Sequence, residues 1–125
     1  MSATDLSGWV VVVAGDDPAL CEVARAALAA GAAVGVVSAH LVDETPASVR
    51  FRADPHDADA WQRIGMHIEQ HLGPIDGVVS DASAHRTVQQ VFDADLRRRG
   101  RSAALVVGSA DSADAIVTAL LHSTG

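Results

Sequence analysis

In this sequence of 125 residues, two missing residue types limit the possible chemistry, and cysteine and aromatic residues are scarce. It contains no tyrosine and no lysine, and it has nine arginines. Its one cysteine, Cys21, excludes a disulfide bond within the chain. With only two Trp and two Phe as aromatic residues, the bulk of a core must come from Val, Leu, Ile and Ala. Any chemistry that needs a tyrosine phenol or a lysine ammonium group from this chain is excluded.

The charge balance and the apolar runs exclude further classes. The formal net charge is −7, and an acidic chain repels phosphate backbones, so we expect no nucleic-acid partner. The sequence has no run of eighteen apolar residues, and its N-terminus lacks the charged-then-apolar pattern of a signal peptide. We therefore expect no membrane association, a cytoplasmic location and one domain over residues 1–125.

Apolar runs alternate with helical patterns along the chain. Strands are expected at Trp9–Ala14, Val34–Ser38, Val49–Ala53, Asp76–Asp81 and Ala103–Gly108. Helices are expected at Pro18–Ala30, from the cap Asp57 to about Leu72, at Ala84–Arg99 and at Asp111–His122. This alternation predicts an α/β fold: a three-layer α/β/α Rossmann-like domain with a five-stranded parallel sheet in the order 3-2-1-4-5. Ligands of such folds bind beyond the carboxyl ends of the strands.

The stretch VVVVAGDDPALCEVARAALAAGAAV has the strand–turn–helix pattern that binds the phosphates of dinucleotides, but two aspartates stand in its turn. A carboxylate about 4 Å from a phosphate charge repels it by roughly 1 kcal/mol in water and roughly 4 kcal/mol at an effective dielectric of 20. Micromolar affinity amounts to only about 8 kcal/mol. We therefore predict that Asp17 caps the helix in place of a ligand and that Asp16 adds to the repulsion.

Residues 6–109 resemble the short-chain dehydrogenases/reductases. AGDDPALC aligns with the TGxxxGxG turn of that family, RADPHDADAW with the segment after strand three, GPIDGVVSDAS with GxIDxLVNNAG, and RRRGRSAALVVGSA with the strand that ends in the catalytic serine. The resemblance implies that the cofactor-binding positions are Gly15, Asp16, Asp17, Ala19, Asp54 and Ala82. It makes Ser109 a candidate for a catalytic residue.

The departures from that family are equally informative. Of the three turn glycines only Gly15 remains, because Ala19 and Cys21 replace the others. The second strand ends in Ser38, where members that use NAD generally have an acid for the ribose hydroxyls, and no arginine for a 2′-phosphate follows directly. The Tyr-x-x-x-Lys pair cannot occur in a chain without either residue type. The family's usual acid–base step therefore has no agent here, which favours a pseudoenzyme.

Acidic residues follow several of the predicted strands. Such oxygen ligands suit Mg²⁺ or Ca²⁺, and Asp16, Asp17 and Asp81 are the weak candidates, although capping of helices explains these residues more simply and we expect no metal. DDPALCEVARAAL and VVSDAS also resemble the response-regulator receivers, which would make Asp81 a phosphoacceptor. That family needs a lysine after strand five, and this chain has none.

Three further patterns have a structural explanation that we prefer. His67 and His71 stand at i, i+4 with His56 nearby, a spacing that binds zinc, but no third ligand is evident. A triad of Ser109, His85 and Asp81 would lack the G-x-S-x-G elbow. Cys21 lies early in a helix with acidic neighbours, so we expect a packing role.

The leading functional hypothesis is a non-catalytic module derived from the dehydrogenase fold, which needs no cofactor and acts by self-association or by docking on a partner protein. By analogy with the family, a homodimer would form through the helices Ala84–Arg99 and Asp111–His122. The alternative is an NAD(P)-binding oxidoreductase or its cofactor-binding half. A receiver-like phosphoacceptor is the second alternative.

Overall fold

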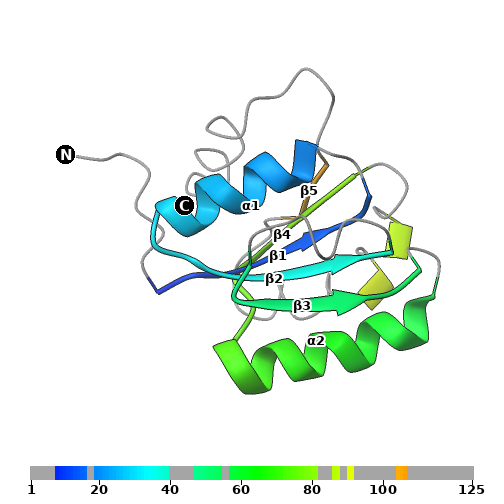
Figure 1. The fold of residues 1–125 in the computed structure, drawn as a ribbon. Helices are drawn as coiled ribbons and strands as arrows, with labels where there is room; N and C mark the ends of the chain where they lie inside the picture. The colour runs from blue at the N-terminus through cyan, green and yellow to red at the C-terminus, as the bar shows by residue number, and fades with distance from the viewer. Residues whose placement is uncertain are drawn as a thin grey trace.

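The computed structural model describes residues 8–16, 19–39, 47–54, 57–81, 86–87, 90–91 and 104–106. Five parallel strands form one sheet in the order β3-β2-β1-β4-β5. The elements are β1 (Val10–Ala14), α1 (Ala19–Ala29), β2 (Ala33–Ser38), β3 (Val49–Arg52), α2 (Ala58–Leu72), β4 (Gly77–Ser80) and β5 (Ala104–Val106). Figure 1 shows α1 on one face of the sheet and α2 on the other.

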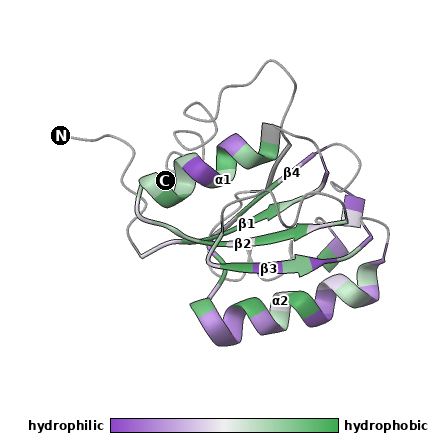
Figure 2. Cartoon of the chain, in the orientation of Figure 1, coloured by the Kyte–Doolittle hydropathy of each residue, from purple (hydrophilic) through white to green (hydrophobic). Residues whose placement is uncertain are grey.

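The central strand β1 is buried on both faces. Its four consecutive valines alternate between two apolar clusters: Val11 and Val13 pack with α1, whereas Val10 and Val12 pack with α2. A strand covered on both sides has no reason to alternate apolar with polar residues, which explains its uniform sequence. Figure 2 shows the same apolar character along β1, β2 and β4.

Helix α1 covers the first face with small and branched side chains. Leu20, Val23 and Ala24 are buried against the sheet. On the opposite side Arg25 pairs with Glu22 at 2.7 Å, and both side chains are exposed. The helix ends where Gly31 takes a φ of +99° and donates its N–H to the carbonyl of Leu28, a role that glycine fills without steric cost.

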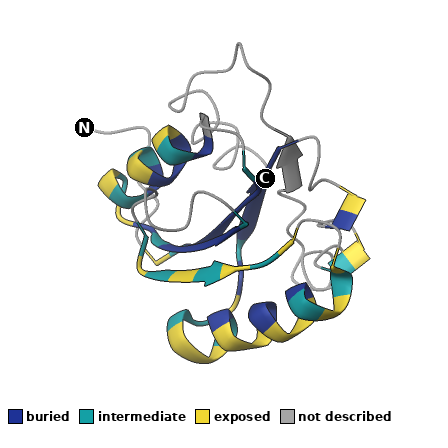
Figure 3. Ribbon diagram, turned by 45° about the vertical axis from the view of Figure 1, so that its right-hand side comes forward, coloured by how far each residue is buried: buried dark blue, intermediate teal, exposed yellow. Residues whose placement is uncertain are grey.

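Helix α2 covers the second face. Asp57 accepts a hydrogen bond from the N–H of Ala60 and so caps the helix as predicted. Trp61, Ile64 and Ile68 form its buried stripe. Figure 3 shows this buried stripe facing the sheet, with exposed residues on the outer side of the helix.

Strand β3 lies at one edge of the sheet and, unlike β1, β2 and β4, it alternates half-buried with exposed residues. Phe51 is half-buried over α2, whereas Arg50 and Arg52 are exposed. Charged side chains on an edge strand discourage pairing with another chain's strand. The charge at this edge therefore protects the sheet.

The predicted α/β class, the parallel sheet and the order 3-2-1-4 of the first four strands are confirmed. Of the fifth predicted strand the structure describes Ala104–Val106, and these residues pair with β4. Of the helix predicted at 84–99, residues 86–87 and 90–91 are described and have helical geometry. The helix predicted at 111–122 lies outside the described residues. In the described part of the chain, no helix has both the length and the apolar character that crossing a membrane requires.

Candidate functional site

The carboxyl ends of β1, β2 and β4 meet at one edge of the sheet. From β1 the chain runs outward through β2 to β3 on one side, and then crosses back through α2 to β4 on the other side of β1. In doubly wound α/β folds, ligands bind at such a point of reversal, outside the strand ends. The turn after β1 and the residue after β4 are therefore the places where a site is expected.

Gly15 lies directly against the carboxylate of Asp81. Its φ is +132°, and a Cβ added at this position would overlap with the Cγ and both carboxylate oxygens of Asp81. Asp81 is only 6% exposed, and its Oδ2 accepts a hydrogen bond of 2.8 Å from the N–H of Asp16. The space that glycine leaves at the start of the turn is thus filled by an acid that follows β4.

The carboxylate of Asp16 extends sideways to the end of β2. Its Oδ1 accepts hydrogen bonds of 2.6 Å from Ser38 Oγ and 3.0 Å from the N–H of Ala39. Ser38 is buried, so its hydroxyl holds the acid in a fixed position. The sequence predicts Asp16 as a charge that faces the phosphates, and it does not reveal these hydrogen bonds to the end of β2.

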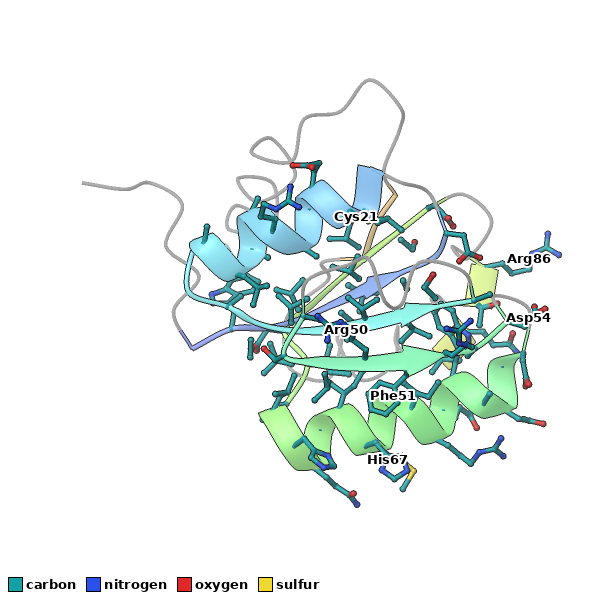
Figure 4. All side chains as sticks on the ribbon, viewed as in Figure 1. Cys21, Arg50, Phe51, Asp54, His67 and Arg86 are labelled. Carbon is teal, nitrogen blue, oxygen red and sulfur yellow. The ribbon has the colours of Figure 1, made fainter. Side chains whose placement is uncertain are left out.

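Two arginines at this edge were also missed. Arg52 is paired in register with Ser38, and its Nη1 donates to the carbonyl oxygen of Ala39 at 3.2 Å. Figure 4 places Arg86 and Asp54 at the same edge of the sheet, and both are exposed. The register of β2 with β3 is the signal that brings Arg52 to the end of β2, and no local pattern in the sequence reveals that register.

Ser80, the last residue of β4, has a buried hydroxyl. It is fully buried, and among the described residues its Oγ has no hydrogen-bond partner. An unsatisfied buried hydroxyl costs roughly 1–3 kcal/mol. Ser80 therefore places a buried hydroxyl without a described partner at the carboxyl end of β4.

Several predicted site residues lie outside the part of the chain that the structure describes. Asp17, Ala82, Ser109 and His85 belong to this group, and of Ala19 only the backbone at the start of α1 is described. The predicted cap at Asp17 therefore stays a prediction, as does the role of Ser109. Within the described ranges, no three His, Cys, Asp or Glu side chains gather as ligands for a metal ion.

The receiver hypothesis gains no support from the site. Receivers have the strand order 2-1-3-4-5, whereas this sheet runs β3-β2-β1-β4-β5. Asp81, the acceptor that this hypothesis requires, is 6% exposed and lies against Gly15.

No protein-family model matches the sequence, and no curated protein matches it. Solved structures do match in fold. A short-chain type dehydrogenase/reductase from Mycobacterium marinum has a TM-score of 0.70 at 19% identity, over 97% of this chain and 69% of that one. A hydroxysteroid dehydrogenase from Escherichia coli has a TM-score of 0.68 at 18% identity, over 96% and 65%. An NADH-dependent reductase complexed with NAD has a TM-score of 0.63 at 15% identity, over 95% and 69%.

The chain spans about two thirds of the length of these structures. This similarity in fold agrees with the resemblance that the sequence shows in the turn after β1, in the segment after β3 and around β4. The chain therefore has the Rossmann-like fold of the short-chain dehydrogenases/reductases.

Proposed function

We propose that this chain is an NAD(H)-binding module of the dehydrogenase type, corresponding to the cofactor-binding half of such an enzyme. The fold supports this proposal, since one similar structure is a reductase complexed with NAD. The observation that carries it is the position of the Asp16 carboxylate, 2.6 Å from Ser38 Oγ at the carboxyl end of β2.

An acid at that position has a defined use in this fold. Dinucleotide-binding folds that use NAD hydrogen-bond the ribose hydroxyls of its adenosine with an acid near the end of the second strand. Strand β2 itself ends in a serine, but Asp16 reaches the same end from the turn after β1. In this proposal Asp16 accepts from the ribose, and Ser38 and the N–H of Ala39 hold it in place.

The same carboxylate predicts a preference between coenzymes. NADP(H) carries a phosphate on the ribose hydroxyl that NAD(H) leaves free. A carboxylate about 4 Å from that phosphate costs roughly 1 kcal/mol in water and roughly 4 kcal/mol at a dielectric of 20. Since about 1.4 kcal/mol is tenfold in affinity, we expect NAD(H) to bind at least about fivefold more tightly than NADP(H). The positive charge of Arg52 would attract the extra phosphate of NADP(H) and so opposes this preference. Its Nη1, however, already donates a hydrogen bond to the carbonyl oxygen of Ala39.

The chain by itself lacks the residues for the usual proton transfer. Neither tyrosine nor lysine occurs among its 125 residues. A proposed oxidoreductase function therefore needs acid–base groups from outside these 125 residues, and the purified chain should bind coenzyme without turnover of alcohols or ketones.

Titration calorimetry of the purified chain with NAD⁺, NADH, NADP⁺ and NADPH tests the proposal. We expect dissociation constants for NAD(H) below about 100 μM, which corresponds to roughly 5.5 kcal/mol. Asp16→Asn should reduce the preference for NAD(H) over NADP(H) to less than about threefold, because it removes the charge. Glu22→Gln is the matched control, since it removes one exposed carboxylate from α1 and leaves the strand ends unchanged.

Two results would contradict the proposal. The first is the absence of heat with millimolar NAD(H) for a chain that is folded by circular dichroism. The second is binding of both coenzymes with equal affinity in the wild-type chain and in Asp16→Asn, which would place the ribose away from Asp16.

One observation favours a second function, a non-catalytic module for self-association or for docking on a partner protein. The carboxylate of Asp81 fills the space beside Gly15 and takes the N–H of Asp16, so part of the turn is already satisfied by the chain itself. On this hypothesis no coenzyme binds, and residues 84–99 and 111–122 supply a homodimer interface. Sedimentation at tens of micromolar distinguishes the two: a dimer without coenzyme binding supports the second function, and a monomer that binds NAD(H) supports the first.

A further inference from the structure

Helix α2 carries two exposed histidines one turn apart. His67 and His71 stand at i, i+4, and their ring centroids are 6.5 Å apart with 43° between the ring planes. Residues at this spacing are neighbours on a helix surface. The pair lies in the second half of α2, which leads to the start of β4, whereas Asp16 and Asp81 lie at the carboxyl ends of the strands (Figure 1).

The hydrogen bond of His71 fixes which of its nitrogens is available. Its Nδ1 lies 2.8 Å from the carbonyl oxygen of His67. A carbonyl oxygen only accepts, so Nδ1 carries the hydrogen, and in the neutral ring the lone pair lies on Nε2. Histidines that bind metals commonly donate their other ring N–H to a backbone carbonyl in this way. The bond orients the His71 ring before any ion arrives.

The other ring is restrained by a neighbour on β3. His67 stacks on Phe51 with a centroid distance of 6.3 Å and an interplanar angle of 26°. Figure 4 shows Phe51 between β3 and α2, with His67 on the helix beside it. This contact reduces the freedom that His67 would lose on binding. Because His67 and His71 are both exposed, their χ angles can still adjust to bring both rings to one ion.

The electrostatic setting favours a cation. His71 stands in the last turn of α2, where the helix dipole is negative. The whole chain has a net charge of −7. A divalent ion at this position therefore meets a favourable field from both sources.

We propose that His67 and His71 form a surface site for a divalent transition-metal ion, with two imidazole nitrogens as protein ligands and water in the remaining positions. Imidazole suits Cu²⁺, Ni²⁺ and Zn²⁺, and the Irving–Williams order makes Cu²⁺ the tightest of the three. Mg²⁺ prefers oxygen ligands and does not bind here. The site is independent of the proposed coenzyme binding.

The test is a titration of the untagged, full-length chain with Cu²⁺, Ni²⁺, Zn²⁺ and Mg²⁺ salts in a buffer that does not chelate. Loss of even an outer partner of a ligating histidine costs about 10–100-fold in metal affinity. We therefore expect His67→Asn and His71→Asn each to weaken Cu²⁺ binding at least about tenfold. His122→Asn is the matched control, because it makes the same chemical change at a histidine outside the pair, and its affinity should equal that of the wild type.

A second readout does not depend on the variants. Substoichiometric Cu²⁺ should broaden the ring NMR signals of His67 and His71 first in the wild-type chain. Equal affinity of wild type and His71→Asn would overturn the proposal. Earlier broadening at other histidines, or a loss in His122→Asn as large as in the pair, would also overturn it.

Discussion

The contact between Gly15 and Asp81 makes a sharp prediction for Gly15→Ala. The φ of Gly15 is +132°, in the region that residues with a Cβ rarely adopt. A methyl group there would overlap with the Asp81 carboxylate, which is 6% exposed and accepts from the N–H of Asp16. Either the backbone or the carboxylate must move.

If the backbone keeps its conformation and Asp81 moves, there are two costs. Holding a residue with a side chain in a sparsely populated backbone region costs about 1–3 kcal/mol. Displacing Asp81 leaves the N–H of Asp16 without this acceptor, which costs roughly 1–3 kcal/mol more. We expect Gly15→Ala to lower the free energy of unfolding by about 2–6 kcal/mol, a large share of the roughly 5–15 kcal/mol typical of a domain.

Urea denaturation followed by circular dichroism measures this change, with an unchanged m-value as the check that unfolding stays two-state. Gly8→Ala is the control for the backbone term alone: its φ is +83°, and a Cβ there would have nothing within 4 Å. It should cost about 1–2 kcal/mol. Gly15→Ala should also cost at least about 1 kcal/mol less in an Asp81→Ala background than in the wild type, because the overlap is gone.

Two results would refute this reasoning. A loss below about 1 kcal/mol for Gly15→Ala would mean that the turn relaxes without strain and without moving Asp81. An equal loss in the wild-type and Asp81→Ala backgrounds would mean that the overlap with the carboxylate contributes nothing.

Two further substitutions test the packing beneath the site. Gly35→Ala would place a Cβ 3.0 Å from Cδ1 of Ile68, so we expect the free energy of unfolding from urea denaturation to fall by about 1–3 kcal/mol. This loss should become smaller in an Ile68→Val background, and additive losses in the double variant would contradict the contact. Trp61→Phe removes the hydrogen bond of 2.9 Å from Trp61 Nε1 to the carbonyl oxygen of Asp54, and we expect a loss of about 2 kcal/mol by the same assay. A loss below about 0.5 kcal/mol would show that this bond adds no net stability.

The sequence predicts those parts of the fold that rest on local pattern. Four valines in a row indicate a strand buried on both faces, and β1 is such a strand. The period of Trp61, Ile64 and Ile68 predicts the buried stripe of α2, and Asp57 predicts its cap. These signals suffice because a helix face and a doubly buried strand are defined by neighbours within a few residues.

The candidate site depends on contacts between segments far apart in the sequence. The side chain of Asp16 is hydrogen-bonded to Ser38, which is 22 positions away in the sequence. The N–H of Asp16 is hydrogen-bonded to Asp81, which is 65 positions away. The pairing of Arg52 with Ser38 follows from the register of β2 with β3, which also requires the sheet order. No periodicity in the sequence encodes these registers, so the direction of the Asp16 carboxylate could not be predicted from the turn alone.

The side chains of Asp16 and Ser38 depend on each other, because Ser38 Oγ donates a hydrogen bond of 2.6 Å to the carboxylate of Asp16. If residue 38 were an acid as well, two like charges would stand at this distance, at a cost of at least about 1 kcal/mol even in water. A single acid at this pair of positions avoids that cost, and here the turn provides the acid while β2 provides the donor. The missing acid at the end of β2 is thus no argument against an acidic ribose site, since the charge at that strand end is present and comes from another loop. What decides the proposed coenzyme preference is where the carboxylate lies, and the sequence position of its residue is secondary.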